Sequence, residues 1–166
     1  MKRSLIQSAA YTIEQEAKAI ASLATFLDDS FDAAVNTIHD AGGRIVITGI
    51  GKSAIVAQKI VATLNSTGSP ALFMHAADAI HGDLGMIQAD DVVLMLSKSG
   101  DSDEIKVLVP LIKNFGNCLI AMTGNLESYL ATKSDFILNT TVDQEACPNN
   151  LAPTTSTTAQ LVMGDV

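Results

Sequence analysis

The sequence predicts an α/β domain, a three-layer α/β/α sandwich built on a five-stranded parallel sheet. Five short apolar runs predict the strands, over residues 44–48, 71–75, 92–97, 118–123 and 136–140. Helical stretches lie between several of them, and strands that are apolar along their whole length are typical of a parallel sheet covered on both faces. The 166 residues suit one such domain and leave little room for two.

Two helices are predicted before the sheet. Residues 4–27 place apolar side chains along one helical stripe, formed by Ile6, Ala9, Ala10, Ile13, Ala17 and Ile20. A second helix is expected over 30–41, because the two glycines that follow are typical of a helix end. Later helices are expected over 52–66, 102–115, 127–132 and 157–166. The chain stops inside the last of these, so we expect residues 1–166 to be a single domain truncated in its C-terminal helix.

Composition narrows the functional classes. Hydrophobic residues make up 48% of the chain and charged residues 17%, which excludes a disordered protein. Ten basic against eighteen acidic residues give a net charge of −8, which is unfavourable for binding nucleic acid. No apolar run is long enough to cross a bilayer, no secretory signal is expected, and two cysteines are too few for a disulfide scaffold. We therefore expect a cytoplasmic protein with no nucleic-acid or membrane partner.

Ligands of open parallel sheets bind beyond the carboxyl ends of the strands, so the loops there are the candidate sites. The first predicted strand runs into Gly49-Ile50-Gly51-Lys52-Ser53. This is not a P-loop, because that motif would need glycine where Val46 stands, and it is not a dinucleotide fingerprint, because Ala54 replaces the third glycine. Two interpretations remain: Lys52 is a cation beside a ligand, or a solvated lysine after a tight turn.

The loop after the third strand is rich in hydroxyl groups. Ser97, Ser99 and Ser102 surround the start of a helix, where free N–H groups favour a phosphate. The alternative is a helix cap at Ser102. Asp101 and Asp103 would repel a phosphate unless their side chains point away.

Two further loops carry titratable groups. His75 and His81 follow the second strand with Asp78 and Asp83, a plausible acid/base set whose six-residue spacing is unusual for a metal site. Glu145 precedes a hydroxyl-rich run that includes Thr155 and Ser156 and opens the last helix. That run either binds a ligand or caps the helix. The four loops together favour a small, anionic, polyhydroxylated ligand, which describes a sugar phosphate.

These residues resemble a known family. The strings GIGKS at 49–53, STGSP at 66–70, HGDLG at 81–85, SxSG at 97–100, and EACP with LAPTTSTT over 145–158 are similar to the sugar-isomerase (SIS) domain of arabinose 5-phosphate isomerases, a flavodoxin-like SIS fold. The HGDLG and EACP…LAPTTSTT strings are specific to this branch, whereas SxSG indicates only the wider superfamily. Members often carry CBS domains and a further histidine in a Ser-His-Pro-Gly-Gly-like segment, which these 166 residues lack.

The resemblance implies interconversion of D-arabinose 5-phosphate and D-ribulose 5-phosphate for 3-deoxy-D-manno-octulosonate biosynthesis (lipopolysaccharide or capsule), with no cofactor and a homotetrameric assembly. It also implies catalytic roles for Lys52, Glu104 and Glu145. Substrate contacts are implied at Gly68, Ser69, His75 and His81, and His75 matches a position of inhibitory zinc. Ser97, Ser99 and Ser102 match the phosphate side of the site.

The isomerisation moves a proton between C2 and C1 through a cis-enediol after the sugar ring opens. Our hypothesis is that Glu104 or His81 removes the proton, that Lys52 stabilises the oxyanion, and that Glu145 assists ring opening. The alternatives are a non-catalytic sugar-phosphate-binding or sensing SIS module and a purely structural α/β domain.

Overall fold

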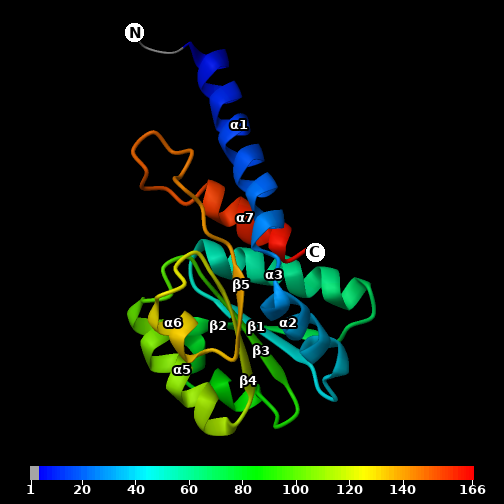
Figure 1. Cartoon of the computed structure of the whole chain (residues 1–166). Coiled ribbons are helices and arrows are strands. Elements are labelled where there is room, and N and C mark those ends of the chain that lie inside the picture. The colour runs from blue at the N-terminus through cyan, green and yellow to red at the C-terminus, as the bar shows by residue number, and fades with distance from the viewer. Residues whose placement is uncertain (1–3) are drawn as a thin grey trace.

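The computed structural model describes residues 4–166 and contains a five-stranded, entirely parallel sheet (Figure 1). The strand order is β2-β1-β3-β4-β5. The strands are β1 (Ile45–Gly49), β2 (Ala71–His75), β3 (Val92–Ser97), β4 (Cys118–Thr123) and β5 (Phe136–Asn139). The predicted fold class is confirmed, and every strand lies where the sequence placed it, to within one residue at either end.

Helices cover both faces of the sheet. α2 (Asp29–Asp40), α3 (Lys52–Ser66) and α7 (Thr155–Met163) pack on one face, while α4 (Ala76–Ile80), α5 (Asp103–Phe115) and α6 (Tyr129–Lys133) pack on the other. Successive strand residues alternate between the two cores: Ile45 and Ile47 join the first, and Val46 joins the second. Because both faces are buried, the strands are apolar throughout, which is why they were visible in the sequence.

The N-terminal helix departs from its prediction. Instead of one helix over 4–27, α1 (Leu5–Leu23) ends in a short 3-10 turn, η1 (Ala24–Phe26). Ser4 and Gln7 form a capping box at its start. α1 packs on α7, and Figure 1 shows its N-terminal part extending away from the sheet. Leu5, Ile6 and Ile13 on this part are largely exposed.

Three other segments also differ from the sequence prediction. The last helix was expected over 157–166, but α7 begins at Thr155 and ends at Met163, with Gly164 as its C-cap. Hydroxyl side chains favour helix caps, and this hid the first turn. The short helices α4 and η2 (Asp83–Met86) were not predicted, since they are too short to show a periodicity. No helix within residues 4–166 is long and apolar enough to span a membrane.

A buried ion pair joins the starts of β1 and β3 at the amino edge of the sheet. The Asp91 carboxylate accepts hydrogen bonds from the Arg44 backbone N–H (2.8 Å), from its guanidinium (2.7 and 3.2 Å) and from the Gln88 N–H (2.9 Å). Burial opposes ionisation, but these donors outweigh it and hold the pKa of Asp91 below its ordinary value. The backbone C=O of Asp91 also accepts from Asn117, which precedes β4.

Asp91→Ala tests this interaction. The substitution leaves Arg44 and the Gln88 N–H without their acceptor, so we expect the free energy of unfolding at pH 7 to fall by about 3 kcal/mol. Urea denaturation measures this, with Asp90→Ala at the exposed neighbouring position as the control. If both variants lose the same small amount, the pair contributes nothing to stability.

Candidate functional site

The strand register brings the ends of β1, β2 and β3 to one level. Gly49 in β1 pairs with His75 on one side and with Leu96 on the other. The chain order reverses between β1 and β3, since β2 flanks β1 on the outside while β4 and β5 continue from β3. In open parallel sheets, ligands bind in the crevice at such a reversal. The loops that follow Gly49 and Ser97 flank this reversal, so the predicted crevice lies between them.

The loop after β1 turns on a glycine. Gly51 has φ 58° and ψ −128°, a conformation that side-chain-bearing residues rarely adopt, and α3 begins at the next residue, Lys52. Lys52 is exposed at this helix start. The hydroxyl of Ser53 donates to the Gln160 side-chain oxygen (3.0 Å), which ties α3 to α7. The loop thus presents a lysine ammonium beside the crevice.

The serine loop after β3 keeps hydroxyl protons available. The oxygens of Ser97 and Ser99 accept from the N–H groups of Gly100 and Asp101 (3.1 and 3.4 Å), and each hydroxyl can still donate its own proton. Ser102 is the N-cap of α5, and its buried hydroxyl has no hydrogen-bond partner among the described residues. Gly100 has φ 66°, and a Cβ there would collide with the side chain of Ser128. A glycine is therefore required to fold the loop.

The aspartates of this loop do not oppose an anion equally. The Asp101 carboxylate accepts from the Tyr129 N–H at the start of α6 (3.0 Å) and from the Asn125 amide (3.5 Å), so it is directed toward α6. Asp103 and Glu104 form the first turn of α5, where Asp103 is exposed and Glu104 is half-buried. Glu104 therefore lies two residues after the N-cap Ser102, in the same turn of α5.

The two histidines lie at the end of β2 and after α4. The Nδ1 atom of His75 accepts from the Ala77 N–H (3.3 Å), and it lies 3.8 Å from an Asp78 carboxylate oxygen. His81 is exposed just after α4. Within residues 4–166 no group of three or more His, Cys, Asp and Glu side chains could hold a metal. The zinc contact at His75 that the family resemblance implies stays a prediction.

Glu145 is a buried carboxylate at the N-terminus of α7. It accepts from the Lys98 ammonium (2.7 Å), the Ser156 hydroxyl and N–H, and the Thr154 hydroxyl and N–H. Burial raises its pKa, but the hydrogen bonds from Lys98, Ser156 and Thr154 prevail and lower it to about 2. Glu145 is therefore ionised throughout the neutral range.

Two residues predicted to contact substrate are engaged inside the protein. The hydroxyl of Thr155 accepts from the Ala146 N–H (2.9 Å), and Ser156 donates to Glu145 from both its hydroxyl and its N–H. Both residues are buried. The Glu145 carboxylate thus occupies the N-terminus of α7 where an anionic ligand could otherwise lie, which favours the capping interpretation. Substrate contact by Thr155 and Ser156 remains a prediction.

Gly68 and Ser69 lie at the opposite edge of the sheet. They follow α3 and precede β2, and they line a surface hollow with His39 and Gly43 at the amino edge. A five-residue strand spans roughly 16 Å, so these two residues cannot reach the same small ligand as Ser97 within one chain. The structure brings together the loops of Lys52, His75, His81, Ser97–Glu104 and Glu145, and it separates Gly68 and Ser69 from them.

Comparison with known proteins identifies the family. Residues 37–166 match the SIS domain. The chain belongs to the SIS domain family. This SIS domain is 53% identical over 160 residues to arabinose 5-phosphate isomerase KdsD of Pseudomonas aeruginosa, and 46% identical over 154 residues to a probable arabinose 5-phosphate isomerase of Haemophilus influenzae. These alignments cover 96% and 93% of this chain but 49% and 46% of the relatives, so the chain spans about half the length of the curated relatives it matches.

A solved structure has the same fold as this chain. The protein c3406 of E. coli CFT073, in complex with arabinose 5-phosphate, has a TM-score of 0.93 and 38% identity, covering 99% of this chain and 88% of its own. The SIS fold expected from the sequence is therefore confirmed.

The pairing of Lys98 with Glu145 in this SIS domain was not predicted from the sequence. Lys98 lies between Ser97 and Ser99, yet its pairing with Glu145 joins positions 47 residues apart in sequence. Its place directly after a strand was a usable signal. No such signal pointed to its partner Glu145, because the sequence near Lys98 does not show which distant loop will lie next to it in the fold.

Glu145→Gln tests the buried carboxylate. The folded pKa of about 2 lies below the ordinary value of 4.5, so the stabilisation is present above pH 4.5 and is lost as the pH falls toward 2. We expect the variant to be less stable at pH 7 by on the order of 3 kcal/mol, and the difference to vanish near pH 2. Urea denaturation across this range measures it, with exposed Glu127→Gln as the control. A difference independent of pH would contradict the ionised state.

Proposed function

We propose that this SIS domain interconverts D-arabinose 5-phosphate and D-ribulose 5-phosphate through a cis-enediol, in the biosynthesis of 3-deoxy-D-manno-octulosonate. One observation carries the proposal. The serine loop lies at the sheet reversal, and the buried hydroxyl of its Ser102 has no hydrogen-bond partner among the described residues. Glu104, an acid/base group, follows this loop in α5, and Lys52 begins α3 after the neighbouring strand. The relatives named for this activity support it.

The proposed roles follow from the environment of each group. Hydroxyls of Ser97, Ser99 and Ser102 and free N–H groups of α5 hold the phosphate. Glu104 or His81 moves the proton between C2 and C1, since both follow strands at the carboxyl edge of the sheet and neither is fully buried. Lys52 stabilises the enediolate oxygen.

Glu145 has a narrower range of roles than the other groups. As a carboxylate with a pKa of about 2, it has no proton to donate at neutral pH. With its side chain 1% exposed and its carboxylate hydrogen-bonded to Lys98, Thr154 and Ser156, it assists ring opening by holding Lys98 and α7 in place and not by contacting the sugar. Another residue of the site, and not Glu145, therefore acts as the general acid.

Glu104→Gln and His81→Ala test the proton transfer. Removal of the group that moves the proton should lower kcat by about 100-fold or more, because general acid–base catalysis contributes on that scale. A coupled assay of ribulose 5-phosphate formation from arabinose 5-phosphate measures it. The control for the first variant is Glu127→Gln, which makes the same change at an exposed position. Near-normal turnover in either test variant removes that residue from the mechanism.

A non-catalytic sugar-phosphate-binding or sensing SIS module is the second candidate. The charged groups Lys52 and Glu104 beside the serine loop exceed what binding alone requires. The same assay separates the two candidates, because a sensing module binds arabinose 5-phosphate without converting it.

The assembly and location that we propose are a homotetramer in the cytoplasm. The exposed apolar side chains of Leu5, Ile6 and Ile13 support association through α1. Gly68 and Ser69 could join a site only from another copy. Two free cysteines, Cys118 and Cys147, suit a reducing compartment.

Combined Ile6→Asp and Ile13→Asp substitutions test association through α1. Burying two new carboxylates at an interface is unfavourable, so we expect light scattering to report a smaller molar mass. Ser8→Asp, on the opposite side of the helix, is the matched control. An unchanged mass in the double variant would show that α1 is not the interface.

A further inference from the structure

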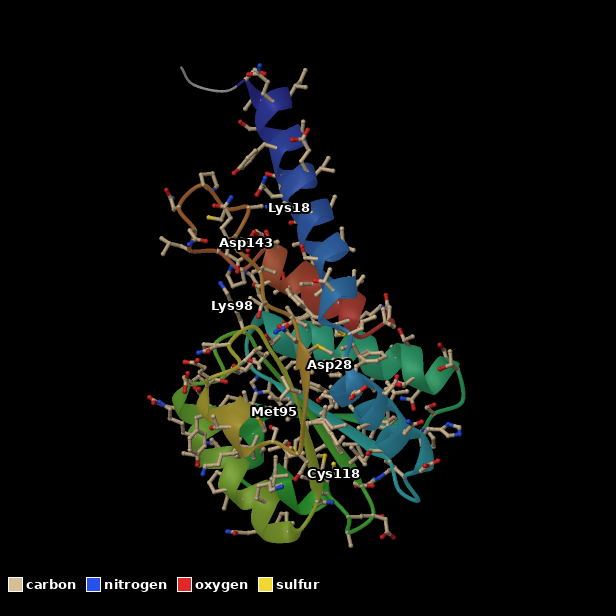
Figure 2. All side chains as sticks on the ribbon, viewed as in Figure 1. Lys18, Asp28, Met95, Lys98, Cys118 and Asp143 are labelled. Carbon is tan, nitrogen blue, oxygen red and sulfur yellow. The ribbon has the colours of Figure 1, made fainter. Side chains whose placement is uncertain are left out.

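The side chain of Lys98 lies across the ends of three strands. Its backbone directly follows Ser97 at the end of β3, and its Cγ lies 3.8 Å from where a Cβ on Gly124 would be, just past β4. Its ammonium reaches Glu145, in the loop that follows β5, at 2.7 Å. In Figure 2, Lys98 lies at the strand ends beside this loop. The lysine therefore connects the serine loop to the segment that precedes α7.

Only part of the Lys98 ammonium is used by the protein. An ammonium has three N–H donors, and Glu145 accepts from one among the described residues. The Lys98 side chain is 49% exposed, while that of Glu145 is 1% exposed. The carboxylate is thus sealed in the protein, while about half of the lysine side chain, which begins in the serine loop, is open to solvent.

The pair holds the cation in a fixed position. Glu145 has four other donors and lies away from water, so removing Lys98 would leave a buried carboxylate without its counter-charge. A lysine on an open surface would lose side-chain entropy on contacting a ligand, whereas this one is already ordered.

The net negative charge of the chain means that an anionic substrate needs a cation such as Lys98 close to where it binds. With a net charge of −8, the whole protein repels an anion, so an anionic substrate depends on local positive groups. At the serine loop, Asp101 is directed toward α6, and Lys98 is the one lysine or arginine within residues 97–104.

We propose that Lys98, held by Glu145, is a substrate-binding residue that donates to the phosphate of the sugar phosphate together with Ser97, Ser99 and Ser102. The inference rests on the proposed sugar-phosphate function and adds a residue to that site. The bond is a charge-assisted N–H···O contact made equally in the ground state and the transition state. It acts on substrate affinity more than on turnover.

Lys98→Met tests the proposal, because methionine keeps an unbranched stem of similar length and removes the charge. Lys98→Arg keeps the charge, and Lys133→Met at the exposed end of α6 makes the same change in net charge away from the site. Isothermal titration with inorganic phosphate and with D-arabinose 5-phosphate measures affinity without requiring turnover. The coupled assay gives KM and kcat, and thermal melting reports folding.

We expect Lys98→Met to weaken phosphate and sugar-phosphate binding by roughly tenfold or more, with KM raised by a similar factor and kcat changed less. Lys98→Arg and Lys133→Met should stay within about threefold of the unmodified protein. Wild-type protein that binds both probes but does not isomerise would refute the proposed activity and leave the Lys98 test intact.

Three results would overturn the inference. The first is phosphate affinity unchanged in a folded Lys98→Met protein that melts at a lower temperature, because this shows that Lys98 only balances Glu145. The second is a fall in kcat at constant KM, because this shows that Lys98 acts through Glu145. The third is wild-type protein that binds neither probe.

Discussion

The common direction of the five strands is the constraint on which the site depends. It gives the sheet two different edges, one where strands begin and one where they end. At the first edge Asp91 and Arg44 neutralise each other inside the protein. At the second, α3 and α5 begin, with Lys52 and Glu104 in their first turns, and the three serines lie between the end of β3 and the start of α5. Backbone geometry therefore gathers these candidate site residues at one edge.

Glu145 shows how a buried charge can organise such an edge. Its carboxylate satisfies the N-terminus of α7 and binds Lys98, so one side chain joins the loops after β3 and β5. A glutamine at this position would offer one acceptor oxygen where Glu145 offers two, and it would leave the ammonium without a counter-charge. The hydrogen bonds of this arrangement lower the pKa of Glu145 to about 2, so Glu145 carries no proton at neutral pH.

The sequence predicted the sheet well and the site unevenly, for physical reasons. Strands buried on both faces are apolar runs, so they were found almost residue by residue. The serine loop was found because hydroxyls directly follow such a run. The partners of Glu145 were not, since Lys98 and Ser156 approach it only through the tertiary fold. Strand direction alone places Gly68 and Ser69 at the amino edge, apart from the strand ends that carry the other residues implied by the family resemblance.

Helix α1 lies before the region that matches the SIS family, yet it contacts the loop that contains Glu145 and helix α7. The SIS family match starts at residue 37, yet Lys18 pairs with Asp143, Gln144 donates to Tyr11 and Gln15, and Thr158 donates to Glu16. These contacts brace the segment that flanks Glu145 from outside the region matched to the family. A protein cut at the family boundary would keep all five strands and lose this brace. The contacts that hold the Glu145 loop and α7 therefore extend beyond the region that matches the family.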